Sequence, residues 1–427
     1  MEQTQSRKAC QAVILNVGDE LLDGIRSNGH LVWLGEQLAR RGIRVLRGSA
    51  VRDDVEQITA EISHAWKEAN LIVTTGGMGP TRDDLTRQAV ASVLGLKLVH
   101  SSEAEVTLRE RFVRLRREVS PGDLRQCLLP EGAQLIPNPR GTSPGIYLSH
   151  EGRTLVMLPG PGLELRPMFE EEVVPRLCSC GVANEGEAYV QIRTFGIGAV
   201  PLENLVRPHL LPGMTLTFGT HTGIVDARIS AGESDACCNR MLDVARKIRD
   251  SVGDDFICTG HACLATLLVE KLAAMGSTVA LGESCTGGLL ASAFTDVPGA
   301  SKVLTGSAVC YSNDAKISML GIPSCIISQH GAVSSECAAA MATAAAEKFG
   351  ADYGLSVTGY AGPSGGTKED PVGTIYIGYA SPSGVWSHRV VLVGDRLQVK
   401  ARAVNTALDW MRRNLSHYGV EDKLHGA

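Results

Sequence analysis

The second half of the chain holds a segment whose residue types suit nucleophilic catalysis. Residues 282–288, Gly-Glu-Ser-Cys-Thr-Gly-Gly, lie between a run that predicts a strand and a run that predicts a helix. At such a corner a side chain is held outward, and the N–H groups that follow can stabilise an oxyanion. Ser284 is the candidate nucleophile, and Cys285 is its rival because thiols need less activation. A serine in this position also suits a helix N-cap, which is the alternative without catalysis.

A serine nucleophile needs a base, and residues 311–316, Tyr-Ser-Asn-Asp-Ala-Lys, offer one. Lys316 is expected one helical turn past a strand end, where its amine can reach a neighbouring loop. An apolar cleft lowers the pKa of a lysine enough for it to accept a proton. The alternative is a solvated surface lysine. His221 and His330 have no motif around them, so we expect structural or surface roles for both.

A third segment of the same region, residues 356–366, reads Ser-Val-Thr-Gly-Tyr-Ala-Gly-Pro-Ser-Gly-Gly. The pattern predicts a strand that runs into a flexible loop of glycine and proline. Such a loop suits closure over a phosphate or a ribose.

The first half of the chain contains a glycine-rich loop that suits anion binding. Residues 75–86, Thr-Gly-Gly-Met-Gly-Pro-Thr-Arg-Asp-Asp-Leu-Thr, follow a predicted buried strand. Glycines in this position let the backbone approach a ligand, and the exposed N–H groups form a nest for an anion. Asp83 and Asp84 could hold a divalent ion against a diphosphate. A turn whose helix start is capped by Thr81 and Asp84 is the alternative.

Three further loops are expected beside this one. They are residues 18–24 (Gly-Asp-Glu-Leu-Leu-Asp-Gly), 141–145 (Gly-Thr-Ser-Pro-Gly) and 158–162 (Leu-Pro-Gly-Pro-Gly). Loops that follow the carboxyl ends of parallel strands converge on one crevice. Asp19 and Glu20 are also explained as solvated loop acids.

The elements that must position these loops alternate along the chain. Apolar runs predict strands at 12–17, 45–51, 71–75 and 154–158, with helices at 28–41 and 55–69. This alternation predicts an open, mostly parallel sheet with helices on both faces. Short strands and helices over 178–258 predict a small α+β domain, to which we assign no chemistry.

A second α/β region is expected from residue 261 onward. Strands are predicted at 278–282, 303–311, 353–358, 373–379 and 390–393, and helices begin near Leu264 and span 335–349 and 398–414. The predicted fold class is therefore two α/β domains joined by a small α+β domain. The predicted domains are 10–177, 178–258 and 259–420.

Composition narrows the classes of function. The chain has 427 residues, 44% apolar and 20% charged, with a net charge of −5. A nonspecific nucleic-acid binder needs a basic excess, and 7 Phe, 4 Trp and 8 Tyr are too few for base-stacking platforms. No apolar run approaches the roughly 20 residues of a membrane span. We therefore expect neither a nucleic-acid nor a membrane partner.

The spacing of the cysteines and the sequence of residues 1–8 predict the cellular compartment of the protein. The 12 Cys are scattered and contain no Cys-x-x-Cys pair; Cys178 and Cys180 are one residue apart, and Cys237 and Cys238 are adjacent. This spacing favours reduced thiols over disulfides or structural zinc. Residues 1–8 do not resemble a secretory signal. The expected location is the cytoplasm.

The loops of the first half together resemble the N-terminal domain of the CinA family (competence/damage-inducible protein A), over residues 12–176. That domain is similar to molybdopterin-binding and molybdopterin-adenylyltransferase proteins. The resemblance implies a nucleotide diphosphate ligand and metal-dependent ADP-ribose pyrophosphatase activity. It implies metal binding by Asp83 and Asp84, and nucleotide binding by Gly18, Asp19, Glu20, Asn28, Gly76, Gly77, Gly79, Thr81, Gly141, Thr142 and Gly160.

This half departs from the family pattern at a few positions. Met78 replaces a usual Leu, and Ser143 replaces a usual Ala. The usual Asp-Thr-Asn before the first helix is Arg26-Ser27-Asn28, so only Asn28 is retained. The missing acid weakens any ribose or metal contact at that point.

The segments of the second half resemble the C-terminal domain of the CinA family, over residues 261–414, which is similar to nicotinamide-nucleotide amidases. The resemblance implies hydrolysis of nicotinamide mononucleotide (NMN) to nicotinic acid mononucleotide and ammonia, without a cofactor. Ser284 would be the nucleophile, activated by Lys316 and Tyr311. The implied substrate-binding residues are Thr286, Gly287, Gly288, Thr358, Gly359, Gly362 and Gly365. Tyr360 and Ser364 replace a usual Ile and Gly, and Tyr360 places a bulky phenol near the loop.

The preferred interpretation is an enzyme of pyridine-nucleotide salvage with NMN and ADP-ribose as ligands. A homodimer is implied by the family alone. The alternative is a non-catalytic module that binds a pterin or nucleotide and regulates competence or the response to DNA damage. A pure binding module would have no reason to keep Ser284, Tyr311 and Lys316 together.

Overall fold

A computed structural model of the chain describes residues 10–231 and 237–416. The predicted absence of a signal in residues 1–8, and residues 417–420 of the third predicted domain, lie outside the described residues. Most of the chain up to Tyr189 forms one compact unit, and most of the chain from Val190 forms a second.

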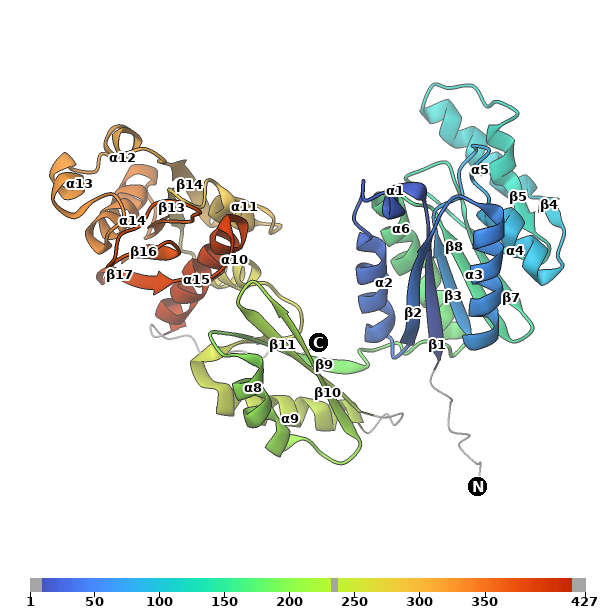
Figure 1. Cartoon of the computed structure of the whole chain (residues 1–427), viewed down its shortest axis with the longest axis horizontal. Coiled ribbons are helices and arrows are strands. Elements are labelled where there is room, and N and C mark those ends of the chain that lie inside the picture. Colours follow the sequence, from blue (N-terminus) through green and yellow to red (C-terminus); the bar gives the residue numbers. More distant parts are fainter. Residues whose placement is uncertain (1–9, 232–236, 417–427) are drawn as a thin grey trace. The chain divides into compact units, whose positions relative to one another are not determined.

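The first unit is built on a six-stranded sheet in the order β2-β1-β3-β8-β7-β6 (Figure 1). The four strands β2, β1, β3 and β8 are parallel, and β7 and β6 are antiparallel additions at one edge. The strands are β1 (Gln11–Val17), β2 (Arg44–Val51), β3 (Leu71–Thr75), β6 (Gln134–Ile136), β7 (Gly145–His150) and β8 (Arg153–Leu158). A separate pair consists of β4 (Leu98–His100) and β5 (Leu128–Pro130).

Alternation along the strands places helices on both faces of this sheet. Val13 and Leu15 of β1 share one apolar core with Ile58 of α3, whereas Ala12 and Ile14 share another with Leu34 of α2 and with α6. Successive side chains of a strand point to opposite faces, so one buried strand supplies both cores. The helices are α1 (Asp19–Leu22), α2 (Gly29–Arg40), α3 (Val55–Glu68), α4 (Thr86–Leu94), α5 (Ser102–Arg114), α6 (Gly162–Met168) and α7 (Val174–Ser179).

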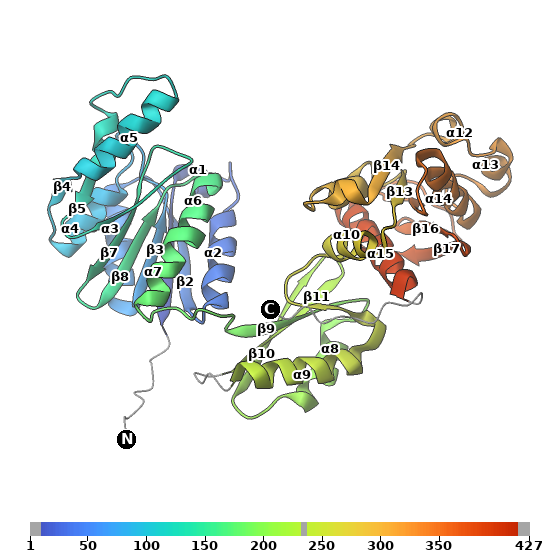
Figure 2. The same cartoon turned by 180° about the vertical axis from the view of Figure 1, so that it is seen from behind.

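The second unit begins with a small module whose sheet has the order β10-β11-β9-β12 (Figure 2). Its strands are β9 (Tyr189–Phe195), β10 (Met214–His221), β11 (Ile224–Ala231) and β12 (Phe256–Thr259). Two helices, α8 (Ala199–Val206) and α9 (Cys237–Val252), pack their apolar faces on it. Ile224 and Ile257 belong instead to the core of the region that follows, so the two parts pack as one body.

That following region is a five-stranded sheet in the order β14-β13-β15-β16-β17. The pairs β13–β14 and β13–β15 are parallel, and the pairs to β16 and β17 are antiparallel. Its strands are β13 (Val279–Glu283), β14 (Leu304–Val309), β15 (Tyr353–Gly359), β16 (Thr374–Ser381) and β17 (Gly384–Val391). Its helices are α10 (Leu264–Met275), α11 (Leu289–Thr295), α12 (Asn313–Leu320), α13 (Ser324–His330), α14 (Ser335–Phe349) and α15 (Arg396–Ser416).

The two faces of this sheet again have separate cores. Helices α10, α11 and α15 cover one face, and α12 and α14 cover the other. Side chains at the carboxyl ends of the adjacent strands β13, β14 and β15 are thereby held at a single edge. This edge carries Ser284 and the segments that begin at residues 311 and 359.

The predicted α/β fold class is confirmed, and most predicted elements agree with the structure to within a few residues. One strand was predicted too far toward the C-terminus: β17 runs from Gly384 to Val391, and the prediction was 390–393. β17 lies at the exposed edge of the sheet and carries polar side chains, so its sequence lacks the alternation of apolar and polar residues that predicts a strand. None of the described helices combines the length and apolar character of a membrane span. The three-domain division stays a prediction.

Candidate functional site

The structure brings Ser284 and Lys316 together at the carboxyl edge of the second α/β sheet. Ser284 follows β13 directly, and its N–H donates to the carbonyl of Val357 in β15 at 2.9 Å. Lys316 lies on α12, and its Nζ is 2.9 Å from Ser284 Oγ. The two side chains are 32 residues apart in the sequence, so only the fold makes them a pair.

The environment of Lys316 favours the neutral amine that a base requires. The residue is only 1% exposed, and its Nζ also donates to the carbonyl oxygens of Cys310 at 3.0 Å and Tyr311 at 3.5 Å. Burial lowers the pKa of Lys316 because the charged form loses its hydration. The described ion pairs include none to this amine, so it has no carboxylate to restore the charged form. The alternative of a solvated surface lysine is therefore wrong.

Cys285, the rival nucleophile, points into the apolar core instead. Its side chain belongs to the cluster formed by α10, α11, α15 and the sheet, and burial raises its pKa to about 12. The thiolate is the reactive form of cysteine, so this thiol is inert near neutral pH. The adjacency of the two residues allows only Ser284 to face Lys316.

Glu283 is a residue of this segment whose role the sequence did not reveal. The side chain is fully buried, and its carboxylate accepts hydrogen bonds from the N–H groups of Gly288 (2.9 Å), Leu290 (3.1 Å) and Ala291 (2.9 Å). Ser307 adds a longer contact of 3.4 Å. These are the N–H groups at the start of α11 that have no partner within the helix. Glu283 caps α11 and holds the turn that carries Ser284.

We expect the Glu283→Ala variant to lose about 3 kcal/mol of stability, because three buried or partly buried N–H groups lose a charged acceptor. Glu283→Gln, which keeps the shape and one carbonyl oxygen, is expected to lose less. The measurement is the midpoint of urea unfolding, with Glu347→Ala on the exposed face of α14 as the control. Equal stability of Glu283→Ala and the control would show that the cap does not hold this turn.

The cap changes the assignment of the oxyanion donors. The N–H of Gly288 is already bound to Glu283, so this predicted substrate-binding residue has no free amide to offer. Within the described parts of the chain, the N–H groups of Cys285 and Thr286 donate to no other residue, which makes them the candidate donors. The buried Thr286 hydroxyl also has no partner. Gly287 forms the turn with a φ of 62°.

Tyr311 is placed differently from the expectation that it activates Ser284. Its ring is 63% exposed, and its hydroxyl accepts a hydrogen bond from Arg396 at 2.9 Å. Only its backbone carbonyl reaches Lys316. A second Arg396 nitrogen donates to the carbonyl of Gly362 at 2.6 Å, which ties the glycine loop to the start of α15.

Of the other predicted substrate-binding residues of this half, some are engaged within the fold and others lie in the glycine loop. The Thr358 hydroxyl is buried and donates to the carbonyl of Ala332 at 2.7 Å. This hydrogen bond fixes the segment that precedes α14. A Cβ at Gly359 would overlap the backbone of Thr374 in β16. Gly362 and Gly365 adopt positive φ values in the loop that follows. Those two glycines remain candidates for substrate contact.

In the first unit the predicted glycine loops meet at the carboxyl ends of β1, β3 and β8. Gly76 donates its N–H to the carbonyl of Leu158 at 3.0 Å, and Gly160 approaches the Gly76 Cα. A side chain at Gly76 would overlap the carbonyl of Val17. The buried Arg87 holds this loop from α4 by donating to the carbonyls of Met78 (2.5 Å) and Gly79 (2.8 Å). The predicted crevice therefore has a close-packed backbone floor.

The two adjacent aspartates do not act as a pair. Asp84 accepts from the N–H groups of Gly79 (2.7 Å) and Thr81 (2.8 Å), and from the Thr81 hydroxyl, so its oxygens close the loop. This agrees with the turn of the alternative but not with its helix cap, because α4 begins at Thr86 without a side-chain cap. Asp83 is exposed, and a hydrogen bond from Thr81 lowers its pKa. Among the described residues no three His, Cys, Asp or Glu side chains group around a common point. The residues present therefore do not fit the predicted metal site of Asp83 and Asp84.

Asp53, which the sequence did not single out, joins the acids of this crevice. It follows β2, and Asp19 and Asp53 each accept a hydrogen bond from the other's N–H, at 3.2 and 3.1 Å. Burial raises the Asp53 pKa, and the charges of Asp19, Glu20 and Asp83 raise it further. A lone Asp two residues after a strand gives no sequence signal.

The remaining predicted residues of this half have local roles in the structure. Asn28 caps α2 by accepting from the N–H of Leu31 at 3.2 Å. Gly141 donates to the side chain of Asn138 at 2.8 Å, and the Thr142 hydroxyl donates to Gln126 at 3.2 Å. Gly18 and Gly77 have positive φ values at the strand ends. These contacts shape the loops, and a ligand contact at these positions stays a prediction.

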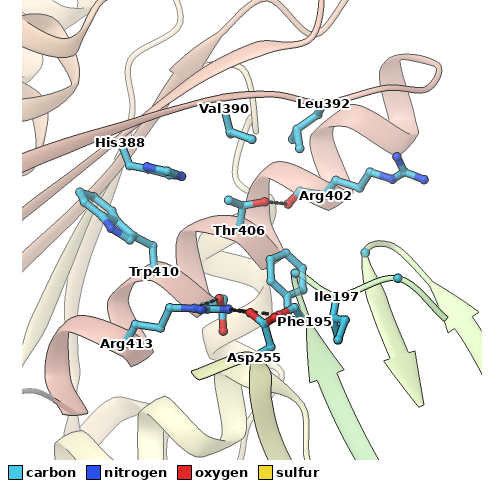
Figure 3. A pocket seen from close by; sticks show the side chains of 14 residues that line it. Phe195, Ile197, Asp255, His388, Val390, Leu392, Arg402, Thr406, Trp410 and Arg413 are labelled. Atoms are coloured by element: carbon cyan, nitrogen blue, oxygen red, sulfur yellow. Dashed lines mark hydrogen bonds and ion pairs between the residues drawn. The ribbon is translucent and has the colours of Figure 1, made fainter. Parts of the chain in front are cut away.

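Elsewhere in the second unit, a cavity of about 600 Å³ lies where the small module meets α15 (Figure 3). His388 and Trp410 stack at one wall, with ring centroids 5.5 Å apart. Arg413 pairs with Asp255 at 2.9 Å and Asp409 at 2.6 Å. The charges of Arg413, Asp255 and Asp409 are thus paired with one another, and the lining of the cavity contains none of the predicted site residues.

The two isolated histidines have ordinary partners. His221 lies 3.4 Å from Asp226, and His330 lies 3.6 Å from Glu336. Both are partly exposed, as expected for structural or surface residues. All ten cysteines whose side chains are described are free.

Comparison with known proteins matches both halves of the chain to family profiles. Residues 261–415 match "CinA C-terminal domain", and residues 13–178 match "Probable molybdopterin binding domain". A protein of Caldanaerobacter subterraneus subsp. tengcongensis named "Putative competence-damage inducible protein" is 40% identical over 94% of this chain and 98% of its own length. A "CinA-like protein" of Geobacter metallireducens is 37% identical, over 95% and 99% of the two chains.

Solved structures match smaller parts of the chain. The structure of "CinA with unknown function" from Thermoplasma acidophilum is 28% identical and covers 39% of this chain and 98% of its own, with a TM-score of 0.37. A competence/damage inducible protein of Agrobacterium tumefaciens is 36% identical over 36% and 93% of the two chains, with a TM-score of 0.35.

Proposed function

The chain belongs to the CinA family, and on that premise we propose that it hydrolyses the carboxamide of NMN to nicotinic acid mononucleotide and ammonia. The observation that carries the proposal is the 2.9 Å contact between Ser284 Oγ and the buried amine of Lys316. A nucleophile beside a base of lowered pKa is the arrangement that acyl transfer from an amide requires. The proposed location is the cytoplasm.

In the first step, Ser284 Oγ attacks the carboxamide carbon and its proton passes to Lys316 Nζ. The candidate donors for the oxyanion are the N–H groups of Cys285 and Thr286, which immediately follow the nucleophile. Lys316 then gives the proton to the leaving nitrogen, and ammonia departs. An ester between Ser284 and the nicotinoyl group remains.

The second step reverses these roles. A water molecule loses a proton to Lys316 and attacks the ester, and Lys316 returns the proton to Ser284 Oγ. One water is consumed for each ammonia released, and no cofactor takes part. Low water access around Lys316 keeps the amine neutral between turnovers.

The test of the proposal is incubation of the full chain with NMN, with chromatography of the nucleotides and an ammonia assay. Equal amounts of ammonia and nicotinic acid mononucleotide are expected. NMN that raises the melting temperature but is recovered intact after hours would favour the alternative, a regulatory module that binds nucleotides or pterins without catalysis.

For the first unit we propose binding of a nucleotide diphosphate such as ADP-ribose at the glycine loops. The close approach of the Gly76 and Gly160 backbones supports this, because a loop without side chains lets phosphate oxygens come near the main chain. Pyrophosphatase activity remains the finer proposal from the family, without a metal site at Asp83 and Asp84, which the described residues do not fit. No hydrolytic step follows from the described residues, because Asp84 is engaged in its own loop.

We expect ADP-ribose to raise the melting temperature of the full chain by several degrees without added metal, since the loops bind the diphosphate themselves. The Arg87→Leu variant, which frees the carbonyls of Met78 and Gly79, is expected to lose most of this shift. Differential scanning calorimetry measures both, with Arg117→Leu on the surface as the control. An equal shift in Arg87→Leu would contradict this use of the loop.

A further inference from the structure

The first turns of α15 bring two cations to the edge of the Ser284 site. Arg396 and Lys400 are four residues apart and therefore lie on one face of the helix. Lys400 Nζ lies 3.7 Å from the point that a Cβ of Gly287 would occupy, beside the turn that begins with Ser284. The positive charge of Lys400 also acts on Cys285 in this turn.

Neither cation is neutralised by an acid within the described residues. Arg396 donates to the Tyr311 hydroxyl and the Gly362 carbonyl, and in the part of the chain that the structure describes no ion pair or hydrogen bond involves the Lys400 amine. The neighbouring Asp395 accepts from the N–H of Gln398 and so caps the helix. The buried Glu283 is bound by the N–H groups of α11. The edge of the site therefore carries an uncompensated positive charge.

We infer that Lys400 binds the phosphate of the mononucleotide and makes the site selective for phosphorylated amides, an inference that rests on the proposed amidase function. Lysine binds phosphate as a compact point charge. The amine lies beside Gly287, the fourth residue of the turn that Ser284 begins, and we expect it to contact a substrate group other than the reacting amide. Arg396 adds a second positive charge and positions Tyr311 and the Gly362 loop around the same ligand.

The kinetic test compares NMN with nicotinamide riboside, which lacks only the phosphate. Lys400→Met is expected to raise KM for NMN by about 10- to 100-fold, the range of one charged hydrogen bond, with kcat within about threefold. The preference for NMN over the riboside, as a ratio of kcat/KM values, falls by the same factor. Lys400→Arg keeps most of that preference. Lys302→Met, which removes an exposed lysine of the same sheet region, is the matched control.

A binding measurement separates this inference from the function it rests on. Calorimetry of NMN binding to Ser284→Ala, with and without Lys400→Met, needs no turnover. Weaker NMN binding in the double variant supports the phosphate contact, even when the wild type releases no ammonia. A wild type that releases no ammonia would contradict only the proposed amidase function. Unchanged binding, or an equal loss of kcat/KM with both substrates, overturns the inference while leaving the amidase standing.

Discussion

Replacement of Lys316 by methionine is expected to reduce ammonia release from NMN by at least about three orders of magnitude, with the fold intact. Methionine fills nearly the same volume but cannot accept the proton of Ser284. The amine is 1% exposed and bonded to Ser284 and two backbone carbonyls, so no water replaces it readily. Lys316→Arg is expected to be equally inactive, because a guanidinium stays protonated. Ammonia release near the wild-type rate by either variant would remove Lys316 from the mechanism.

The same lysine predicts how activity depends on pH. The neutral amine is the active form, and burial lowers its pKa. The value of kcat/KM should therefore rise with pH through this lowered pKa and level off above it. A bell-shaped pH profile of kcat/KM, or a decrease of kcat/KM with rising pH, would indicate a different base.

Stability should depend on pH in the same direction. Between the lowered pKa of folded Lys316 and about 10.4 in the unfolded chain, the unfolded state binds a proton that the folded state does not. The free energy of unfolding therefore gains from this group as pH rises across that interval. Urea unfolding at several pH values should show that Lys316→Met lacks this gain and exceeds the wild type in stability at the lower pH.

Ser284→Ala is expected to lower ammonia release by about 10³-fold or more, because it removes the attacking oxygen. Cys285→Ala is the matched comparison: it removes only a thiol that lies in the apolar core and keeps the backbone N–H. We expect that variant to retain catalysis and to lose roughly 1 kcal/mol of stability from the small cavity. Steady-state ammonia assays and urea unfolding measure the two effects. Loss of activity in Cys285→Ala with retention in Ser284→Ala would reverse the assignment of the nucleophile.

Much of the fold was predictable because each α/β sheet is buried on both faces. Continuous apolar runs such as 71–75 and the Leu31, Leu34 and Leu38 pattern of α2 are strong local signals. The exposed edge strand β17 was misplaced because its side chains face solvent and carry no such period. The antiparallel strands β6 and β7 had no signal of their own within a long segment of loops.

The site was predictable only where a residue type and its motif were enough. Ser284 and Lys316 follow strands that are neighbours in the sheet, so their meeting follows from topology. The roles of Glu283, Arg396 and Lys400 depend on which helix start or turn each side chain reaches, and the sequence does not contain those distances. For Asp84 the motif was misleading: it suggested a metal ligand, whereas the carboxylate oxygens accept hydrogen bonds that close the loop.

The most direct test of Ser284 as the nucleophile is mass spectrometry of the peptide that contains Ser284 and Cys285, after the reaction with NMN is stopped by acid within the first turnovers. We expect a nicotinoyl nucleotide ester on Ser284, formed together with the first ammonia and absent from Ser284→Ala. An adduct on Cys285, or steady ammonia release with no adduct on Ser284, would contradict this assignment.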